Sequence, residues 1–204
     1  MPAKVFLQID NADQRACDGA TFERRSPITS EVVTVAAFAK SADVDRAVVS
    51  AQAAFAGWSQ KGPSEKRAVL NRCADALEAR VEAFVKIGVA ETGSTPFWYR
   101  NNVKIAASML REAAAMTTQI KGEIIPANKP GTLAMGYRQP IGVLVGMAPW
   151  NAPIILGVRS FAMPIACGNT VVMKASEKCP GLHRLIGDCM AEGGLPPGVL
   201  NILT

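Results

Sequence analysis

The stretch RQPIGVLVGMAPWNAPIILGVRSFAMPIACGNTVVMKASE, residues 138–177, contains the pattern that decides the fold. A first apolar run, 141–147, stops at Ala-Pro-Trp-Asn, and a second begins after Cys-Gly-Asn and stops at Lys-Ala-Ser-Glu. A helical segment between them gives a strand–helix–strand unit. In parallel α/β sheets, ligands bind just beyond the carboxyl ends of the strands. The candidate site residues at these two ends are Asn151, Lys174 and Glu177.

The same alternation continues to the last residue of the sequence. The predicted elements are a strand at 141–147, a helix at about 152–165, a strand at 170–174, a helix at about 180–192 and a strand at 199–203. Pro180 is placed to begin the second helix and Gly193 to end it. Strands that alternate with helices predict a parallel sheet with right-handed crossovers. The last strand has no closing helix after it, so we expect this chain to be the N-terminal portion of a longer protein, or one ordered piece of it.

The sequence before residue 141 predicts strands, then helices, then an extended ribbon. We expect strands at Lys4–Ile9 and Glu31–Ala39, because both are rich in β-branched or aromatic residues. Helical spacing predicts three helices: one capped by Ser41 that runs to about 58, one from Pro63 to the Gly93 region, and one from Pro96 to about 119. Glycines and prolines punctuate 121–140, which predicts an extended hairpin or arm. A ribbon of this length is not stable alone, so it must lie on another domain or subunit.

Composition narrows the class of protein. Of 204 residues, 49% are hydrophobic and 19% are charged, so the chain can bury a core. The net charge of +5 comes from scattered lysines and arginines with acids between them, which favours a solubilising surface over a nucleic-acid site. Five cysteines without a C-x-x-C motif and one histidine support neither a disulfide framework nor a metal site. With no secretory signal and no uninterrupted apolar span, we expect no membrane segment and a cytoplasmic location.

Four motifs in a fixed order resemble the aldehyde dehydrogenase superfamily. They are Gln-Pro-Ile-Gly-Val (139–143), Pro-Trp-Asn-x-Pro (149–153), Gly-Asn-Thr-Val-Val-x-Lys-x-Ser-Glu (168–177) and Gly-Leu-Pro-Pro-Gly-Val-Leu-Asn (194–201). The local pattern Asn-Ala-Pro-Ile-Ile-Leu-Gly-Val-Arg (151–159) looks like the branch that oxidises salicylaldehyde, benzaldehyde and vanillin. The resemblance implies NAD-dependent oxidation of an aromatic aldehyde to its carboxylic acid through a cysteine thiohemiacetal.

The resemblance also implies a fold and a division of the chain. The expected fold is α/β and aldehyde dehydrogenase-like: a Rossmann-like parallel sheet with flanking helices and an extended β arm. Residues 1–120 would form the N-terminal part of the NAD-binding domain, 121–140 an oligomerisation arm, and 141–204 the βαβαβ core of that domain. A homodimer or homotetramer would assemble through the arm. Members of the family are more than twice this long, so we expect the catalytic domain to lie outside this chain.

Asn151 matches the residue that stabilises the oxyanion in this family. Its amide N–H can donate without titrating, and the prolines on either side stiffen the turn. The neighbouring Ala148, Pro149 and Trp150 are expected to contact the cofactor. The alternative for Asn151 is a helix cap, which is a common role for asparagine.

Lys174 and Glu177 match the pair that holds the adenosine ribose. A carboxylate accepts hydrogen bonds from ribose hydroxyls and repels a 2′-phosphate, so NAD is favoured over NADP. The alternative is an ordinary surface ion pair. No G-x-G-x-x-G motif follows any predicted strand, and the resemblance implies a mode of cofactor binding that does not use this motif.

Arg159 and Trp98 are the candidates for the substrate pocket. Arg159 follows Asn151 by eight positions on the predicted helix, so the two point in similar directions. An arginine there can orient an oxygen-bearing aromatic ring, and Trp98 can supply a flat wall. The alternative is that Arg159 pairs with an acid and Trp98 belongs to the core.

The residue that would attack the aldehyde is missing from the pattern. Cys167 lies at a strand entry and reads as packing, as do Cys73 and Cys189. Neither Glu91 nor Glu123 matches the catalytic glutamate of the family, and His183 reads as a surface or packing residue. We therefore expect the nucleophile after residue 204. The competing hypotheses are a non-catalytic nucleotide-binding or oligomerisation protein that ends at 204, and a reductase or semialdehyde dehydrogenase on the same fold.

Overall fold

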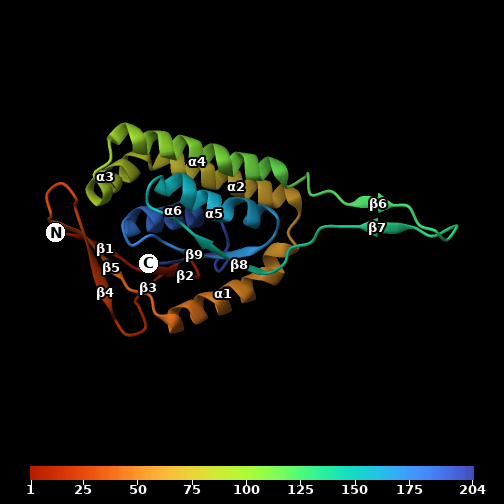
Figure 1. Cartoon of the computed structure of the whole chain (residues 1–204), viewed down its shortest axis with the longest axis horizontal. Coiled ribbons are helices and arrows are strands. Elements are labelled where there is room, and N and C mark those ends of the chain that lie inside the picture. The colour runs from red at the N-terminus through yellow and green to blue at the C-terminus, as the bar shows by residue number, and fades with distance from the viewer.

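Ten strands and six helices make up residues 1–204 in the computed structural model (Figure 1). The strands are β1 (Ala3–Val5), β2 (Leu7–Ile9), β3 (Ala12–Gln14), β4 (Thr21–Arg25), β5 (Val32–Ala37), β6 (Glu123–Ile125), β7 (Ala134–Gly136), β8 (Val143–Met147), β9 (Thr170–Lys174) and β10 (Leu200–Leu203). The helices are α1 (Ser41–Ser59), α2 (Pro63–Ala79), α3 (Val81–Thr92), α4 (Pro96–Met116), α5 (Pro153–Ala166) and α6 (Pro180–Glu192).

The central sheet has the strand order β3-β2-β10-β9-β8. Its strands β8, β9 and β10 are parallel, as the alternation of strands and helices predicted. β2 and β3 join them antiparallel, so the sheet is mixed. β10 lies between β2 and β9, and all four of its residues are buried. The free edge on the parallel side is β8.

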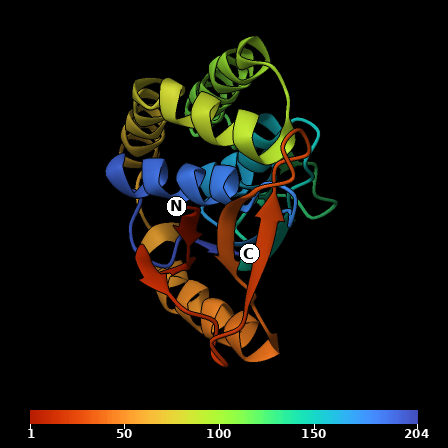
Figure 2. The same cartoon turned by 90° about the vertical axis from the view of Figure 1, so that its left-hand side faces the viewer.

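Helices cover the two faces of this sheet unequally. α5 and α6 pack on one face, and α2, α3 and α4 form a further layer outside them. α1 alone lies on the other face, against β8, β9 and β10. Figure 2 shows α1 on one side of the sheet and the other helices on the opposite side. The main core of 35 buried residues therefore lies between the sheet and the thicker helical layer, and a smaller cluster of eight lies mostly under α1.

The N-terminal strand was predicted as one element and is two. The break falls at Phe6: β1 pairs with β5 in a separate sheet of order β1-β5-β4, whereas β2 pairs with β10. The apolar run is therefore shared between two sheets. The hairpin partners β3 and β4 were not predicted, because neither has an alternating apolar pattern.

Three helix boundaries also differ from the prediction. Ser41 is the first residue of α1, and the cap is Lys40, whose backbone N–H donates to the Asp43 carboxylate. The helix predicted from Pro63 to Gly93 is interrupted at Arg80, where φ is −103° and ψ is 18°, and this gives α2 and α3. Gly93 ends α3 as predicted, with a positive φ of 74° that favours glycine. α4 ends at Met116, slightly before the predicted end.

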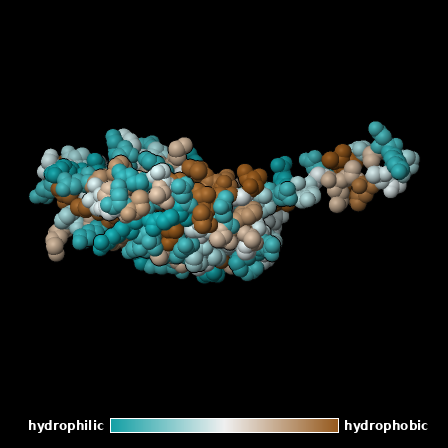
Figure 3. Space-filling model, turned by 90° about the horizontal axis from the view of Figure 1, so that it is seen from below, coloured by the Kyte–Doolittle hydropathy of each residue, from teal (hydrophilic) through white to brown (hydrophobic).

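The ribbon at 121–140 is a β hairpin of β6 and β7 that extends away from the body (Figure 1). Ile124 pairs with Met135, and their exposed fractions are 78% and 63%. Figure 3 shows apolar residues gathered on this arm. An isolated two-stranded ribbon has too little burial to be stable by itself. The structure therefore agrees with the predicted arm, and its apolar surface has no partner within the chain.

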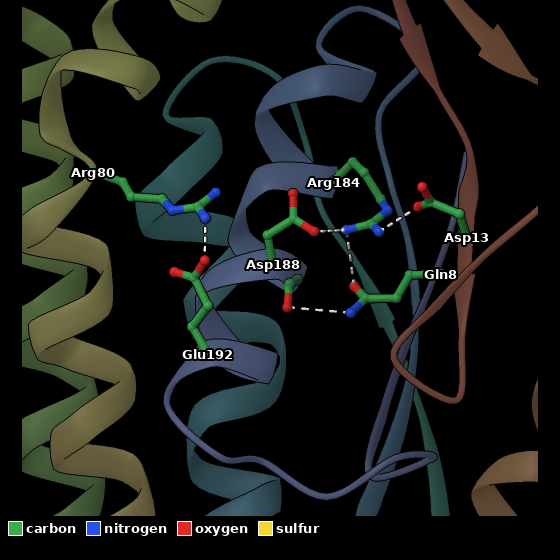
Figure 4. Close-up of polar contacts among 7 residues, drawn as sticks. Gln8, Asp13, Arg80, Arg184, Asp188 and Glu192 are labelled. Carbon is green, nitrogen blue, oxygen red and sulfur yellow. Dashed lines mark hydrogen bonds and ion pairs between the residues drawn. The ribbon is translucent and has the colours of Figure 1, made fainter.

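A polar network fixes α6 against the strand β2 and the strand β3. Arg184 pairs with Asp188 on its own helix and with Asp13 on β3, and its guanidinium also contacts the Gln8 amide (Figure 4). The same Gln8 side chain donates to the Gly187 carbonyl at 3.2 Å. The Arg184 side chain is only 11% exposed, whereas its partners Asp13 and Asp188 are 60% and 40% exposed, so Arg184 is largely buried and the two carboxylates lie at the surface. The network sets the rotation of α6, which carries the neighbouring His183 into the interior.

Candidate functional site

The turns that follow β8 and β9 lie side by side. Met147 is in register with Lys174, and the Ala148 N–H donates to the Lys174 carbonyl at 3.1 Å. The segments 148–151 and 174–177 therefore leave the sheet from adjacent parallel strands at the same edge. This is the edge at which α/β folds bind ligands. The structure thus brings together the two groups of candidate residues that the sequence placed there.

Asn151 does not cap the helix that follows it. The cap position of α5 is Ala152, which makes no side-chain capping bond. Asn151 is exposed, and its backbone carbonyl accepts a hydrogen bond from Trp98 Nε1 at 3.3 Å. Its side-chain amide makes no hydrogen bond within the chain, so both N–H groups are free to donate to a ligand. The capping alternative is therefore wrong.

Trp98 connects α4 to the Asn151 turn through that indole hydrogen bond. The ring is partly buried and packs against the main core, so it is both a core residue and a neighbour of the site. Arg159 is exposed on α5 and makes no ion pair within the chain, so the predicted pairing with an acid is absent. Asn151 precedes α5, so the argument that placed it on one helix with Arg159 was wrong.

Lys174 and Glu177 form a loose pair on the surface. Their Nζ and Oε2 atoms are 3.5 Å apart, and the side chains are 60% and 62% exposed. A hydrogen bond from its own backbone N–H, with Lys174 nearby, holds the pKa of Glu177 below its usual value, so the carboxylate is ionised at neutral pH. A pair this exposed contributes little to stability, and both groups remain available to a ligand.

An apolar hollow of about 300 Å³ lies beside this pair. Its lining includes Phe38, Val44, Val48 and Val145 together with Lys174 and Glu177. Val145 is 70% exposed there, since β8 is an edge strand. Apolar walls beside a few polar groups are typical of small-molecule sites. In the turn after β8, Trp150 is half exposed, and the Lys178 ammonium lies 5.1 Å from the centre of its ring.

His183 is a buried residue between the two turns, and the prediction of a surface or packing residue was incomplete. Its Nδ1 accepts from the Ser176 N–H at 3.0 Å, and its Nε2 lies 3.1 Å from the Pro153 carbonyl. Complete burial lowers the pKa of His183 to about 4. Nothing in the sequence signalled this role, because it depends on partners that the fold brings to the ring.

Three of the five cysteines are buried thiols. Burial raises the pKa of Cys73 and of Cys189 to about 12 and also raises the pKa of Cys179. Cys167 is partly buried at the C-terminal end of α5. All five cysteines are free, and no group of three or more His, Cys, Asp or Glu side chains converges to hold a metal ion. No helix has the length and apolar character needed to cross a bilayer.

Fold and site together define a Rossmann-like α/β protein with a long β arm and polar turns at the carboxyl ends of its parallel strands. The sequence model of the aldehyde dehydrogenase family matches residues 14–204, and the chain belongs to that family. The α/β fold is that of aldehyde dehydrogenases, as predicted.

Relatives with known names are similar over nearly all of this chain. A vanillin dehydrogenase of Pseudomonas sp. (strain HR199 / DSM 7063) is 57% identical over 200 residues, which cover 98% of this chain and 41% of that protein. The crystal structure of a salicylaldehyde dehydrogenase from Pseudomonas putida G7 complexed with salicylaldehyde gives a TM-score of 0.96 at 44% identity, over 98% of this chain and 42% of that one. The structure of PnpE in complex with nicotinamide adenine dinucleotide gives a TM-score of 0.94 at 34% identity, over 100% of this chain and 41% of that one. The chain thus spans about 41% of the length of the curated relatives it matches.

Proposed function

We propose that the protein containing this chain is an NAD-dependent dehydrogenase that oxidises an aromatic aldehyde to the carboxylic acid. The observation that carries the proposal is the shared edge of β8 and β9. The free amide of Asn151 and the Lys174–Glu177 pair lie in the turns that follow these two adjacent strands. A backbone hydrogen bond from Ala148 to Lys174 joins the two turns. The names of the vanillin and salicylaldehyde dehydrogenase relatives support an aromatic substrate. In this proposal residues 1–120 form the N-terminal part of the NAD-binding domain and residues 141–204 form its βαβαβ core.

The chain offers the residues that NAD requires. Glu177 accepts from ribose hydroxyls, Lys174 donates to them, and the apolar hollow beside them receives the adenine. The turn Ala148-Pro149-Trp150 contacts the rest of the cofactor. NAD supplies the hydride acceptor. The negative charge of Glu177 disfavours a 2′-phosphate, so we propose NAD over NADP.

Asn151 stabilises the oxyanion that forms when a thiolate attacks the aldehyde carbonyl. Its N–H donates to that oxygen and lowers the barrier to the thiohemiacetal. We propose that the thiolate and the carboxylate that activates water belong to residues after 204, because none of the five cysteines in this chain matches the catalytic context of the family. Trp98 and Arg159 would line the aldehyde site, the first through its indole ring and the second through hydrogen bonds to ring oxygens.

A panel of aldehydes tests this function in the full-length protein. Vanillin, salicylaldehyde, benzaldehyde, a short aliphatic aldehyde and a semialdehyde are each supplied with NAD or NADP, and NADH or NADPH formation, or its consumption in the reverse direction, is followed at 340 nm. We expect the aromatic aldehydes with NAD to give the highest kcat/KM. A protein that binds NADH but oxidises none of them would be the non-catalytic alternative, and a preference for a semialdehyde or for reduction would indicate the other relative of this fold.

Replacing Glu177 with glutamine should change the choice of cofactor. The neutral amide removes the repulsion toward a 2′-phosphate and weakens the grip on the ribose hydroxyls. We expect the ratio of kcat/KM for NADP to that for NAD to rise about tenfold, which corresponds to roughly 1.4 kcal/mol. Glu123→Gln, in the arm, is the matched control and should leave the ratio unchanged. An unchanged ratio in Glu177→Gln would remove this residue from the ribose site.

We propose that the protein assembles into a homodimer or homotetramer through the arm. We also propose a cytoplasmic location, because free cysteines are typical of a reducing compartment. Aspartates at Ile124 and Met135 would place two charges on the exposed apolar face of the arm. We expect the double variant to elute as a smaller species, because desolvating two carboxylates opposes burial of that face. Light scattering coupled to gel filtration measures the mass. The control Val49→Asp changes an exposed apolar residue on α1 and should leave the mass as it is; a double variant of unchanged mass would contradict the role of the arm.

A further inference from the structure

His183 is the one histidine of the chain, and it lies in the first turn of α6 with no exposed surface. One ring nitrogen faces each of the two turns that carry the candidate site. Nδ1 is 3.0 Å from the Ser176 backbone nitrogen, and Nε2 is 3.1 Å from the Pro153 carbonyl oxygen. Ser176 lies between Lys174 and Glu177, and Pro153 is the second residue after Asn151. The imidazole therefore spans both groups of ligand-binding residues.

The hydrogen bonds determine which ring nitrogen carries the proton. A backbone N–H can only donate, so Nδ1 must be unprotonated to accept from Ser176. The proton is then on Nε2, where it is donated to the Pro153 carbonyl. Burial lowers the pKa of His183 to about 4, so the ring is neutral at neutral pH and makes both bonds at once. A protonated ring would lose the bond to Ser176.

Gly157 on the neighbouring helix leaves room for two side chains of α6. A Cβ atom there would lie 2.8 Å from the Cδ1 atom of Ile186 and 3.3 Å from the Cδ2 atom of His183, both closer than ordinary packing. Neither α5 nor α6 is capped by the side chain of its own cap residue. α5 and α6 have Ala152 and Cys179 at their cap positions, and neither makes a side-chain capping bond. His183 contacts the Ser176 amide in the turn before α6 and the carbonyl of Pro153, which is the first residue of α5.

We propose that His183 is a positioning residue that holds the Asn151 turn and the Lys174–Glu177 turn in a fixed relation, through one ring nitrogen for each. This inference rests on the proposed function, because it assigns the first turn to the oxyanion and the second to the ribose. A rigid link of this kind matters because catalytic groups lose much of their effect when displaced by about 1 Å.

Two isosteric variants separate the two hydrogen bonds. His183→Asn places an acceptor oxygen near Nδ1 and removes the group at Nε2. His183→Gln places a donor near Nε2 and removes the acceptor at Nδ1. In the full-length enzyme we expect His183→Asn to keep NADH affinity and lose about five- to tenfold in kcat, and His183→Gln to do the reverse. The size follows from roughly 1 kcal/mol for one hydrogen bond.

A packing role would give a different pattern. Ile186→Val removes a buried methyl group one turn further along α6, near α5, and should lower stability by about 1 kcal/mol without changing either constant. NADH affinity is measured by fluorescence titration and kcat with saturating aldehyde. If both isosteric variants lose affinity and turnover together, or if neither changes, His183 only packs and the inference is wrong.

Hydrogen exchange keeps this test independent of the proposed activity. The Ser176 amide should exchange faster in His183→Gln than in His183→Asn, whose acceptor preserves its bond. An inactive wild-type enzyme would refute the proposed function, and equal exchange of Ser176 in the two variants would refute the link itself. The two failures are therefore distinguishable in one set of proteins.

Discussion

Asn151→Ala should lower the kcat of the full-length enzyme by roughly a hundred- to a thousandfold, which is typical for loss of one oxyanion donor. The expectation follows from the free side-chain amide beside β8, whose N–H groups have no partner within the chain. Because Asn151 is exposed and does not cap α5, the melting temperature should stay within about 1 °C of wild type. NADH affinity should also be unchanged, since the amide acts on the substrate oxygen.

Asn151→Asp is the matched control for this prediction. Aspartate has the same shape and caps helices as well as asparagine does, so it would restore any structural role. It cannot donate to an oxyanion when ionised, and its charge repels one. We therefore expect the aspartate variant to be at least as slow as the alanine variant. Recovery of turnover in Asn151→Asp would show that the side chain acts through the turn and not on the oxygen.

The segment from β8 to β10 could be predicted because its signals are local. Apolar runs end at Pro149 or Lys174, and prolines begin α5 and α6, so periodicity and punctuation agree. The position of Asn151, Lys174 and Glu177 at one edge then follows from the rule for parallel sheets. The arm was predictable for a similar reason, since glycines and prolines break its pattern.

Other features depend on partners far along the sequence. The division of Lys4–Ile9 at Phe6 exists because β1 pairs with β5 and β2 with β10. The break at Arg80 has no glycine or proline to mark it, and the helical pattern continues through it. His183 and Glu91 look like isolated polar residues in helices, and only the fold shows that each binds several backbone groups. Sequence periodicity therefore located the ligand-binding turns but not the buried groups that support them.

Glu91→Ala should lower the free energy of unfolding by about 3 kcal/mol, because this buried carboxylate caps α6 from another helix. Its oxygens accept from the Gly181 N–H at 2.9 Å, the Leu182 N–H at 3.2 Å and the Thr34 hydroxyl at 2.8 Å. These two amides are in the first turn of α6, where intrahelical partners are lacking and the cap residue Cys179 provides none. The alanine variant would leave all three donors without an acceptor. Chemical denaturation measures the loss.

The same carboxylate should make stability depend on pH. Burial raises the pKa of Glu91 from 4.5 to about 7, although its three donors favour the ionised form. The folded protein therefore binds a proton that the unfolded chain has already lost between pH 4.5 and 7, so the contribution of Glu91 decreases as pH rises through this window, by about 3 kcal/mol at most. His183 acts oppositely: its lowered pKa makes stability rise from about pH 4 to 6.5.

Comparison with Glu91→Gln isolates the carboxylate from the histidine. Glutamine keeps one acceptor for the α6 amides and has no titration, whereas His183 is the same in both proteins. The difference in unfolding free energy between wild type and Glu91→Gln should therefore shift in favour of the glutamine variant as pH rises from 4.5 to 7. A difference that stays constant across this range would mean that Glu91 is already ionised throughout it, with the three donors outweighing the cost of burial. The loss of stability in Glu91→Ala would still measure the cap.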